Sequence, residues 1–92
     1  MTITDDLLRV ARRVVWFKPP EEAVRDRTLF LAHVMTYGTV EDITVVRRHY
    51  SEADLRGVLE QAPAGVFDAR SWAYWNTMLG RIPVPDLPRR RL

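Results

Sequence analysis

Helix-start signals and helix-breaking residues divide this chain into short segments. Their positions constrain its fold more than any other feature. Thr39-Val-Glu-Asp42 and Ser51-Glu-Ala-Asp54 both have capping-box spacing, with Asp in the position that Glu usually takes. Thr4 and Asp68 are candidate caps for two further helices, and Pro20 is well placed to begin another. The residues that end these segments are Pro19, Gly38, Pro63 and Gly80. The pattern predicts five short helices.

Apolar residues recur at helical spacing within each segment. After Thr4, the residues Leu7, Val10 and Val14 fall on one side of a helix. Residues 20–37 read as a single helix with a one-sided apolar stripe that ends at Gly38. No segment has the alternation of a strand, and a hydrophobic content of 47% in 92 residues suffices for one core. We therefore predict an all-α fold, a compact bundle of about five short helices.

The basic charge of the chain is confined to its C-terminal end. The formal net charge is +2, and residues 82–92 alone contribute +2, from three arginines and one aspartate. Residues 1–81 are therefore neutral, with no net field to attract a polyanion. We predict a single helical domain over residues 1–81 and a flexible, extended, Pro-rich tail over residues 82–92.

Several classes of protein are disfavoured by composition. The chain has no cysteine, which excludes disulfides and thiolate metal sites. It has no apolar run of the ~20 residues that a membrane-spanning helix needs. Its first residues include Asp5 and Asp6, where a signal peptide would be basic. We expect a cytoplasmic protein that does not contact membranes.

Residues 37–55 read as helix, tight turn and helix, which raises the possibility of a DNA-binding helix-turn-helix. In that motif the start of the second helix enters the major groove. Here the start carries Glu52 and Asp54, which are poorly suited to a groove lined by phosphates. A regulator of this kind would use Arg47 and Arg48, with the tail residues Arg89, Arg90 and Arg91, to contact phosphates. The alternative, a corner between two capped helices, is favoured.

No constellation in the sequence indicates catalysis. His33 and His49 are the only histidines and lie on different predicted helices, and His33 has no His, Asp or Glu three or four residues further on. The adjacent carboxylates occupy first turns of helices, where the helix dipole accounts for them. The glycines are scattered and form no phosphate-binding loop. We expect a protein that is not an enzyme and needs no cofactor or metal.

Aromatic residues form the most unusual pattern. In residues 70–79, Trp72, Tyr74 and Trp75 lie in an apolar arc of about 160° at helical spacing. The arc suits a packing helix of the core, but a domain of this size can hardly bury every large residue. Trp16 and Phe17, beside the Pro19-Pro20 break, are a second candidate. If exposed, these five residues would anchor a protein partner or a second copy of the chain.

The order of these features resembles a family of small, uncharacterised prokaryotic helical proteins. The resemblance covers roughly residues 16–80, from an aromatic start through a "YG…ED" corner to a closing aromatic helix. The matching positions are Trp16, Phe17, Tyr37, Gly38, Glu41, Asp42, Tyr50, Leu55, Trp75 and Leu79. Lys18 departs from the family pattern, which commonly has an acidic residue there, and the segment before Trp16 lies outside the match.

Members of that family are often encoded beside a nucleotidyltransferase-type toxin of the abortive-infection class. The resemblance therefore implies an antitoxin-like accessory protein that binds such a toxin, and it implies no catalytic residues. A protein-interaction module is the function expected from the sequence, and a DNA-binding regulator is the alternative.

Overall fold

A computed structural model describes residues 3–88 of the chain, which contain helices but no strand. The helices are α1 (Asp5–Val14), α2 (Pro20–Arg25), α3 (Arg27–Tyr37), α4 (Val40–His49), α5 (Glu52–Glu60) and α6 (Ala69–Met78). The predicted all-α fold is confirmed. None of the helices in this part of the chain has the length and apolar content needed to cross a membrane.

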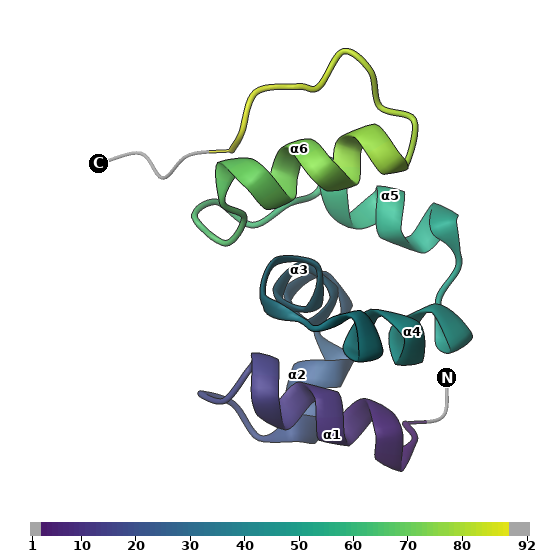
Figure 1. The fold of residues 1–92 in the computed structure, drawn as a ribbon. Helices are drawn as coiled ribbons and strands as arrows, with labels where there is room; N and C mark the ends of the chain where they lie inside the picture. Colours follow the sequence, from purple (N-terminus) through teal and green to yellow (C-terminus); the bar gives the residue numbers. More distant parts are fainter. Residues whose placement is uncertain (1–2, 89–92) are drawn as a thin grey trace.

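Helix α3 lies at the centre of the fold and packs against all five other helices. In Figure 1, α1, α2 and α4 lie on one side of α3, and α5 and α6 lie on the other. Six consecutive residues, 30–35, are buried in α3. The apolar stripe predicted for this segment is buried except at Tyr37. Ala32 and His33, outside that stripe, are buried as well, because other helices surround the middle of α3.

The segment predicted as one helix, residues 20–37, forms two. Asp26 ends α2 with a non-helical backbone (φ −84°, ψ 78°) and its side chain accepts from the backbone N–H of Leu29 at the start of α3. An Asp in this position is a good cap, because its carboxylate satisfies an N–H group that has no partner within the helix. The chain therefore has six helices in its described part rather than five.

The predicted caps of the later helices are confirmed. Both capping boxes form, with Thr39 and Asp42 at α4 and Ser51 and Asp54 at α5. Asp68 accepts from the backbone N–H of Ser71 at 2.7 Å and caps α6. Thr4 occupies the N-cap position of α1 as predicted, but its side chain makes no capping hydrogen bond, because its hydroxyl donates to Asp6 instead.

Gly38 ends α3 as predicted, but its backbone is extended rather than left-handed. An added Cβ would lie 2.5 Å from the carbonyl oxygen of Val34, so a side chain is excluded by a close backbone approach. Gly80 does adopt a left-handed conformation, with φ +78°, after α6.

Residues 81–88 contain no helix and return along α6 (Figure 1). The indole N–H of Trp72 donates to the carbonyl oxygen of Pro85 at 2.7 Å, and Leu87 packs against the core. The flexibility predicted for residues 82–92 stays a prediction, and Arg89, Arg90 and Arg91 lie outside the described residues.

Candidate interaction surface

Trp16 and Phe17 are exposed in the turn between α1 and α2. The exposed fractions of these side chains are 79% and 51%. Val15 is fully buried, and its N–H donates to the carbonyl oxygen of Ala11 at the end of α1. The next two residues face outward, and Pro19 then precedes the first residue of α2. Their rings meet edge to face, with centroids 5.6 Å apart. The predicted exposure of this pair is confirmed.

The two rings continue into a series that reaches α3. Phe17 lies 5.5 Å from the ring of His33, and His33 lies 5.8 Å from the ring of Tyr37. Tyr37, at the end of α3, is 62% exposed. We call Trp16, Phe17, His33 and Tyr37 the aromatic surface. With Arg13 and Val14 these residues border a hollow of about 350 Å³.

His33 is the most buried residue of the aromatic surface, with only 8% of the residue exposed. Its Nδ1 lies 2.8 Å from the carbonyl oxygen of Leu29, one turn earlier in α3. A carbonyl oxygen accepts, so Nδ1 carries a proton and donates to it. The hydrogen bond orients the His33 ring, and the rings of Phe17 and Tyr37 lie against it.

An ion pair between α1 and α4 holds the base of this surface. Arg13 is half exposed and its guanidinium donates to the carboxylate of Asp42, whose side chain is only 3% exposed. The same carboxylate accepts from the N–H of Thr39 at 3.0 Å in the capping box. A buried carboxylate is tolerated where hydrogen bonds and a cation compensate it, as they do here. Asp42 therefore fixes α1, and the turn after it, against α4.

Trp72 and Trp75 were wrong as surface anchors, because both are only 4% exposed. The indole N–H of Trp75 donates to the carbonyl oxygen of Met35 in α3 at 2.7 Å. Trp72 packs against Phe67, with ring centroids 5.4 Å apart, and is covered on its other side by the segment around Pro85. Residues 81–88 supply the cover that the sequence did not reveal.

Only one edge of the predicted aromatic arc remains at the surface. Tyr74 is 53% exposed and Met78 is 59% exposed. Tyr74 borders a second hollow of about 320 Å³, where Val40, 80% exposed, lies across from it on α4. We call Tyr74, Met78 and Val40 the α6 patch. The predicted exposure of Tyr74 is confirmed.

Tyr37 and Val40 were not among the predicted contact residues, because each fitted the apolar stripe of its helix. Tyr37 precedes Gly38 and Val40 follows it by two residues, where the chain leaves α3 and enters α4. A large apolar residue within two positions of a helix-ending glycine is the signal that could have identified them, because helix ends lie at the periphery of a small bundle.

The residues proposed for DNA contact show no groove-reading arrangement. Arg47 and Arg48 are exposed at the end of α4, and Arg47 pairs with Glu52 at 3.4 Å. Glu52 also pairs with Arg56 at 3.5 Å, and Asp54 pairs with Arg27 at 3.2 Å. The start of α5 therefore presents carboxylates engaged with arginines of this chain. Arg89–Arg91 lie outside the described residues.

The two histidines are not brought together. His33 belongs to the aromatic surface, whereas His49 Nε2 lies 3.3 Å from Asp6 and 3.4 Å from the Thr4 hydroxyl. The Thr4 hydrogen bond, with a smaller contribution from His49, holds the pKa of Asp6 below its usual value despite partial desolvation. Within residues 3–88 no three His, Asp or Glu side chains are grouped to hold a metal.

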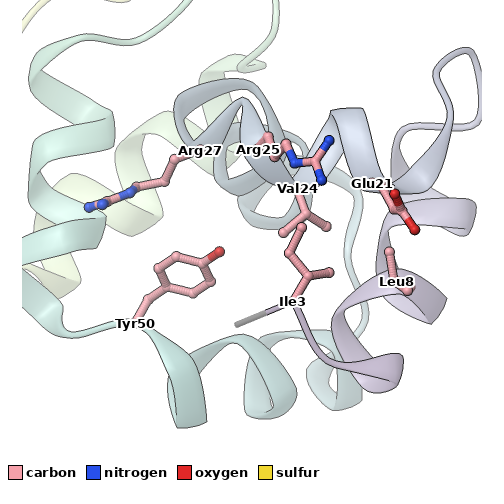
Figure 2. A pocket seen from close by; sticks show the side chains of 7 residues that line it. All are labelled: Ile3, Leu8, Glu21, Val24, Arg25, Arg27 and Tyr50. Atoms are coloured by element: carbon pink, nitrogen blue, oxygen red, sulfur yellow. The ribbon is translucent and has the colours of Figure 1, made fainter. Parts of the chain in front are cut away.

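A separate hollow of about 480 Å³ opens between α1, α2 and the end of α4 (Figure 2). Its apolar wall is formed by Ile3, Leu8 and Val24. Its polar residues are Glu21, Arg25, Arg27 and Tyr50. We call it the Tyr50 pocket, because the Tyr50 hydroxyl points into it. Sequence reasoning missed this site, since its residues come from the segment before α1, from α1, α2 and α3, and from the end of α4.

Comparison with protein-family models, with curated proteins and with solved structures gives no match to this chain.

Proposed function

We propose that this protein is a non-catalytic protein-interaction module whose partner binds the aromatic surface. The observation that carries the proposal is Trp16, a large apolar side chain that is 79% exposed and stands at the end of a fixed series of rings. Leaving one tryptophan in water is ordinary, but a contiguous exposed aromatic patch is typical of an interaction site. Tryptophan and tyrosine are also frequent at the energetic centres of interfaces.

The construction of the aromatic surface supports the same proposal. His33 and Tyr37 belong to α3, where Leu29 orients His33, and the turn that carries Trp16 and Phe17 follows a helix that the Arg13–Asp42 pair holds against α4. A preorganised surface loses little conformational entropy when a partner binds. The hollow beside Trp16 offers space for one side chain of the partner.

The partner that we propose is a nucleotidyltransferase-type toxin encoded by a neighbouring gene, which makes this chain an antitoxin-like protein. This part of the proposal rests on the family resemblance of residues 16–80. Five of the matching positions, Trp16, Phe17, Tyr37, Gly38 and Asp42, form or support the aromatic surface.

Co-expression with the product of the neighbouring gene tests the proposal. Only this chain is tagged, and the purified material is analysed by size exclusion with light scattering. We expect a stoichiometric complex that is lost in the double variant Trp16→Ala, Tyr37→Ala. Tyr74→Ala is the matched control, since Tyr74 is an exposed aromatic of the α6 patch.

Three results would contradict the proposal. Loss of the complex in Tyr74→Ala alone would move the interface to the α6 patch. A homo-oligomer without a second protein would indicate self-association. Salt-dependent DNA binding that is lost in Arg47→Gln, Arg48→Gln would favour the DNA-binding alternative.

A further inference from the structure

The hydroxyl group of Tyr50 lines the Tyr50 pocket. Tyr50 is only 6% exposed, its ring is packed at the junction of α4 and α5, and Figure 2 shows its oxygen pointing into the hollow. The oxygen is open to the pocket rather than sealed in the core, since no sealed side-chain oxygen or nitrogen within residues 3–88 lacks a hydrogen-bond partner. A hydroxyl group at the wall of a pocket can donate to a ligand there in place of water.

The hydroxyl is a hydrogen-bond donor at neutral pH. Burial raises the pKa of Tyr50 above its usual value, and Asp54 adds to this rise, while the nearby charge of Arg27 opposes it. Tyr50 therefore keeps its proton and has one O–H to donate. A ligand that reaches it must present an acceptor.

Cationic groups border the same space. Arg25 is exposed on α2 at the rim of the pocket and forms no ion pair with any of the described residues. Arg27 is paired with Asp54 at 3.2 Å through Nη1, which leaves its other N–H donors unused by that carboxylate. A carboxylate group of a ligand matches this set of donors, because it accepts several hydrogen bonds and carries the opposite charge.

The rest of the pocket limits the ligand in size and charge. Ile3, Leu8 and Val24 form an aliphatic wall, and about 480 Å³ lies within the range of sites for small molecules. Glu21 has its carboxylate at the rim beside Leu8, as Figure 2 shows. A second negative charge on the ligand would be repelled there, which disfavours phosphates and dicarboxylates.

We propose that the Tyr50 pocket binds a monocarboxylate with a short aliphatic body. Tyr50 and Arg25 donate to the carboxylate, and the aliphatic body lies against Ile3, Leu8 and Val24. The same chemistry occurs in a free aliphatic acid and at the C-terminal leucine or valine of a peptide. The pocket does not include the aromatic surface, so its test and that of the proposed function are separate.

Titration of the full chain with sodium hexanoate, followed by amide NMR, tests this inference. We expect a saturable shift at the amides of Val24, Arg25 and Tyr50, with a dissociation constant of about 1 mM for a ligand of this size. Hexanol, which has the same body without the charge, should bind about tenfold more weakly. A peptide with a C-terminal leucine carboxylate, compared with its amide, shows which source of the carboxylate binds more tightly; either source upholds the proposal.

Substitutions that are expected to change the hexanoate affinity in opposite directions make the test specific. Arg25→Gln and Tyr50→Phe should each weaken hexanoate binding by about tenfold, whereas Glu21→Gln should strengthen it by about threefold. Arg56→Gln is the matched control, an exposed arginine on α5 outside the pocket, and should change nothing.

The absence of a saturable shift at these amides would overturn the inference. Weaker hexanoate binding in Glu21→Gln would also overturn it, because removal of a negative charge at the rim should favour an anion bound as proposed. If Tyr50→Phe does not fold, Arg25→Gln and Glu21→Gln still decide the question, since both residues are exposed.

Discussion

The turn between α1 and α2 and the helix α6 both carry tryptophan, yet the turn exposes it and the helix buries it. Trp72 and Trp75 each donate their indole N–H to a backbone carbonyl oxygen, on Pro85 and Met35. Trp16 has no such hydrogen bond among the described residues and is 79% exposed. An indole is buried at low cost only where its N–H finds an acceptor, so the acceptors distinguish structural tryptophans from one available to a partner.

The largest expected effect is on the free energy of unfolding, and it follows from replacing a buried tryptophan. Trp75→Ala removes a large side chain from the core and leaves the Met35 carbonyl oxygen without its donor, so the free energy of unfolding should fall by about 3–5 kcal/mol. Denaturation in urea, followed by circular dichroism, measures it. Trp16→Ala is the control and should change the free energy by less than about 0.5 kcal/mol. Equal losses of unfolding free energy in the two variants would contradict the distinction between a buried Trp75 and an exposed Trp16.

The ion pair beneath the aromatic surface provides the next test. Asp42→Ala removes a cap of α4 and the partner of Arg13, and we expect a loss of about 2 kcal/mol. The loss stays moderate because Arg13 is half exposed and remains hydrated. Asp54→Ala is the comparison, since Asp54 has the same role in the capping box of α5 and also pairs with an arginine, Arg27, but is more exposed. A loss in Asp54→Ala as large as in Asp42→Ala would show that burial of the Asp42 carboxylate does not strengthen its contact with Arg13.

A smaller effect should follow from the cover of Trp72. Trp72→Phe keeps an aromatic ring but removes the N–H that donates to Pro85, so the stability should fall by about 1 kcal/mol. Amide hydrogen exchange of residues 81–88 should accelerate at the same time. Unchanged exchange would mean that the indole does not hold this segment against α6.

The smallest effect concerns the pH dependence of the helix that carries the buried tryptophans. The N–H and hydroxyl groups of Ser71 hold the pKa of Asp68 below its usual value of 3.8. This carboxylate therefore contributes stability at pH values above about 4, and the contribution is lost as the pH falls through the lowered pKa. Asp68→Asn keeps a cap that does not titrate.

Thermal unfolding between pH 6 and pH 2 measures that difference. The unmodified chain should lose more stability on acidification than Asp68→Asn. Asp6 and Asp54 also have lowered pKa values, so both proteins should still lose some stability as the pH falls. Identical slopes would contradict the role of Asp68.

Local signals allowed much of this fold to be predicted. The two capping boxes and the Asp68 cap are short-range features, and they marked the starts of α4, α5 and α6 correctly. The break at Asp26 was missed because the apolar pattern continues across it. The cover of Trp72 by Pro85 was missed because the two residues are thirteen positions apart and no helical period includes that contact.

The candidate site was predictable in part for the same reason. Trp16 and Phe17 could be identified because Pro19 and Pro20 stop the helix beside them. Tyr37 could not be joined to them, because its place depends on how α3 packs against α1. The Tyr50 pocket combines residues from the N-terminal segment, α1, α2, α3 and the end of α4, which only tertiary structure brings together.

Fluorine NMR of the chain labelled with 5-fluorotryptophan tests the central claim most directly, since the chain has three tryptophans. One resonance, assigned to Trp16 by its loss in Trp16→Phe, should show a solvent isotope shift between H₂O and D₂O, and the other two should show almost none. Addition of the partner should move and broaden that resonance alone. A solvent shift at Trp72 or Trp75, or a partner that moves their resonances while leaving Trp16 unchanged, would contradict the account.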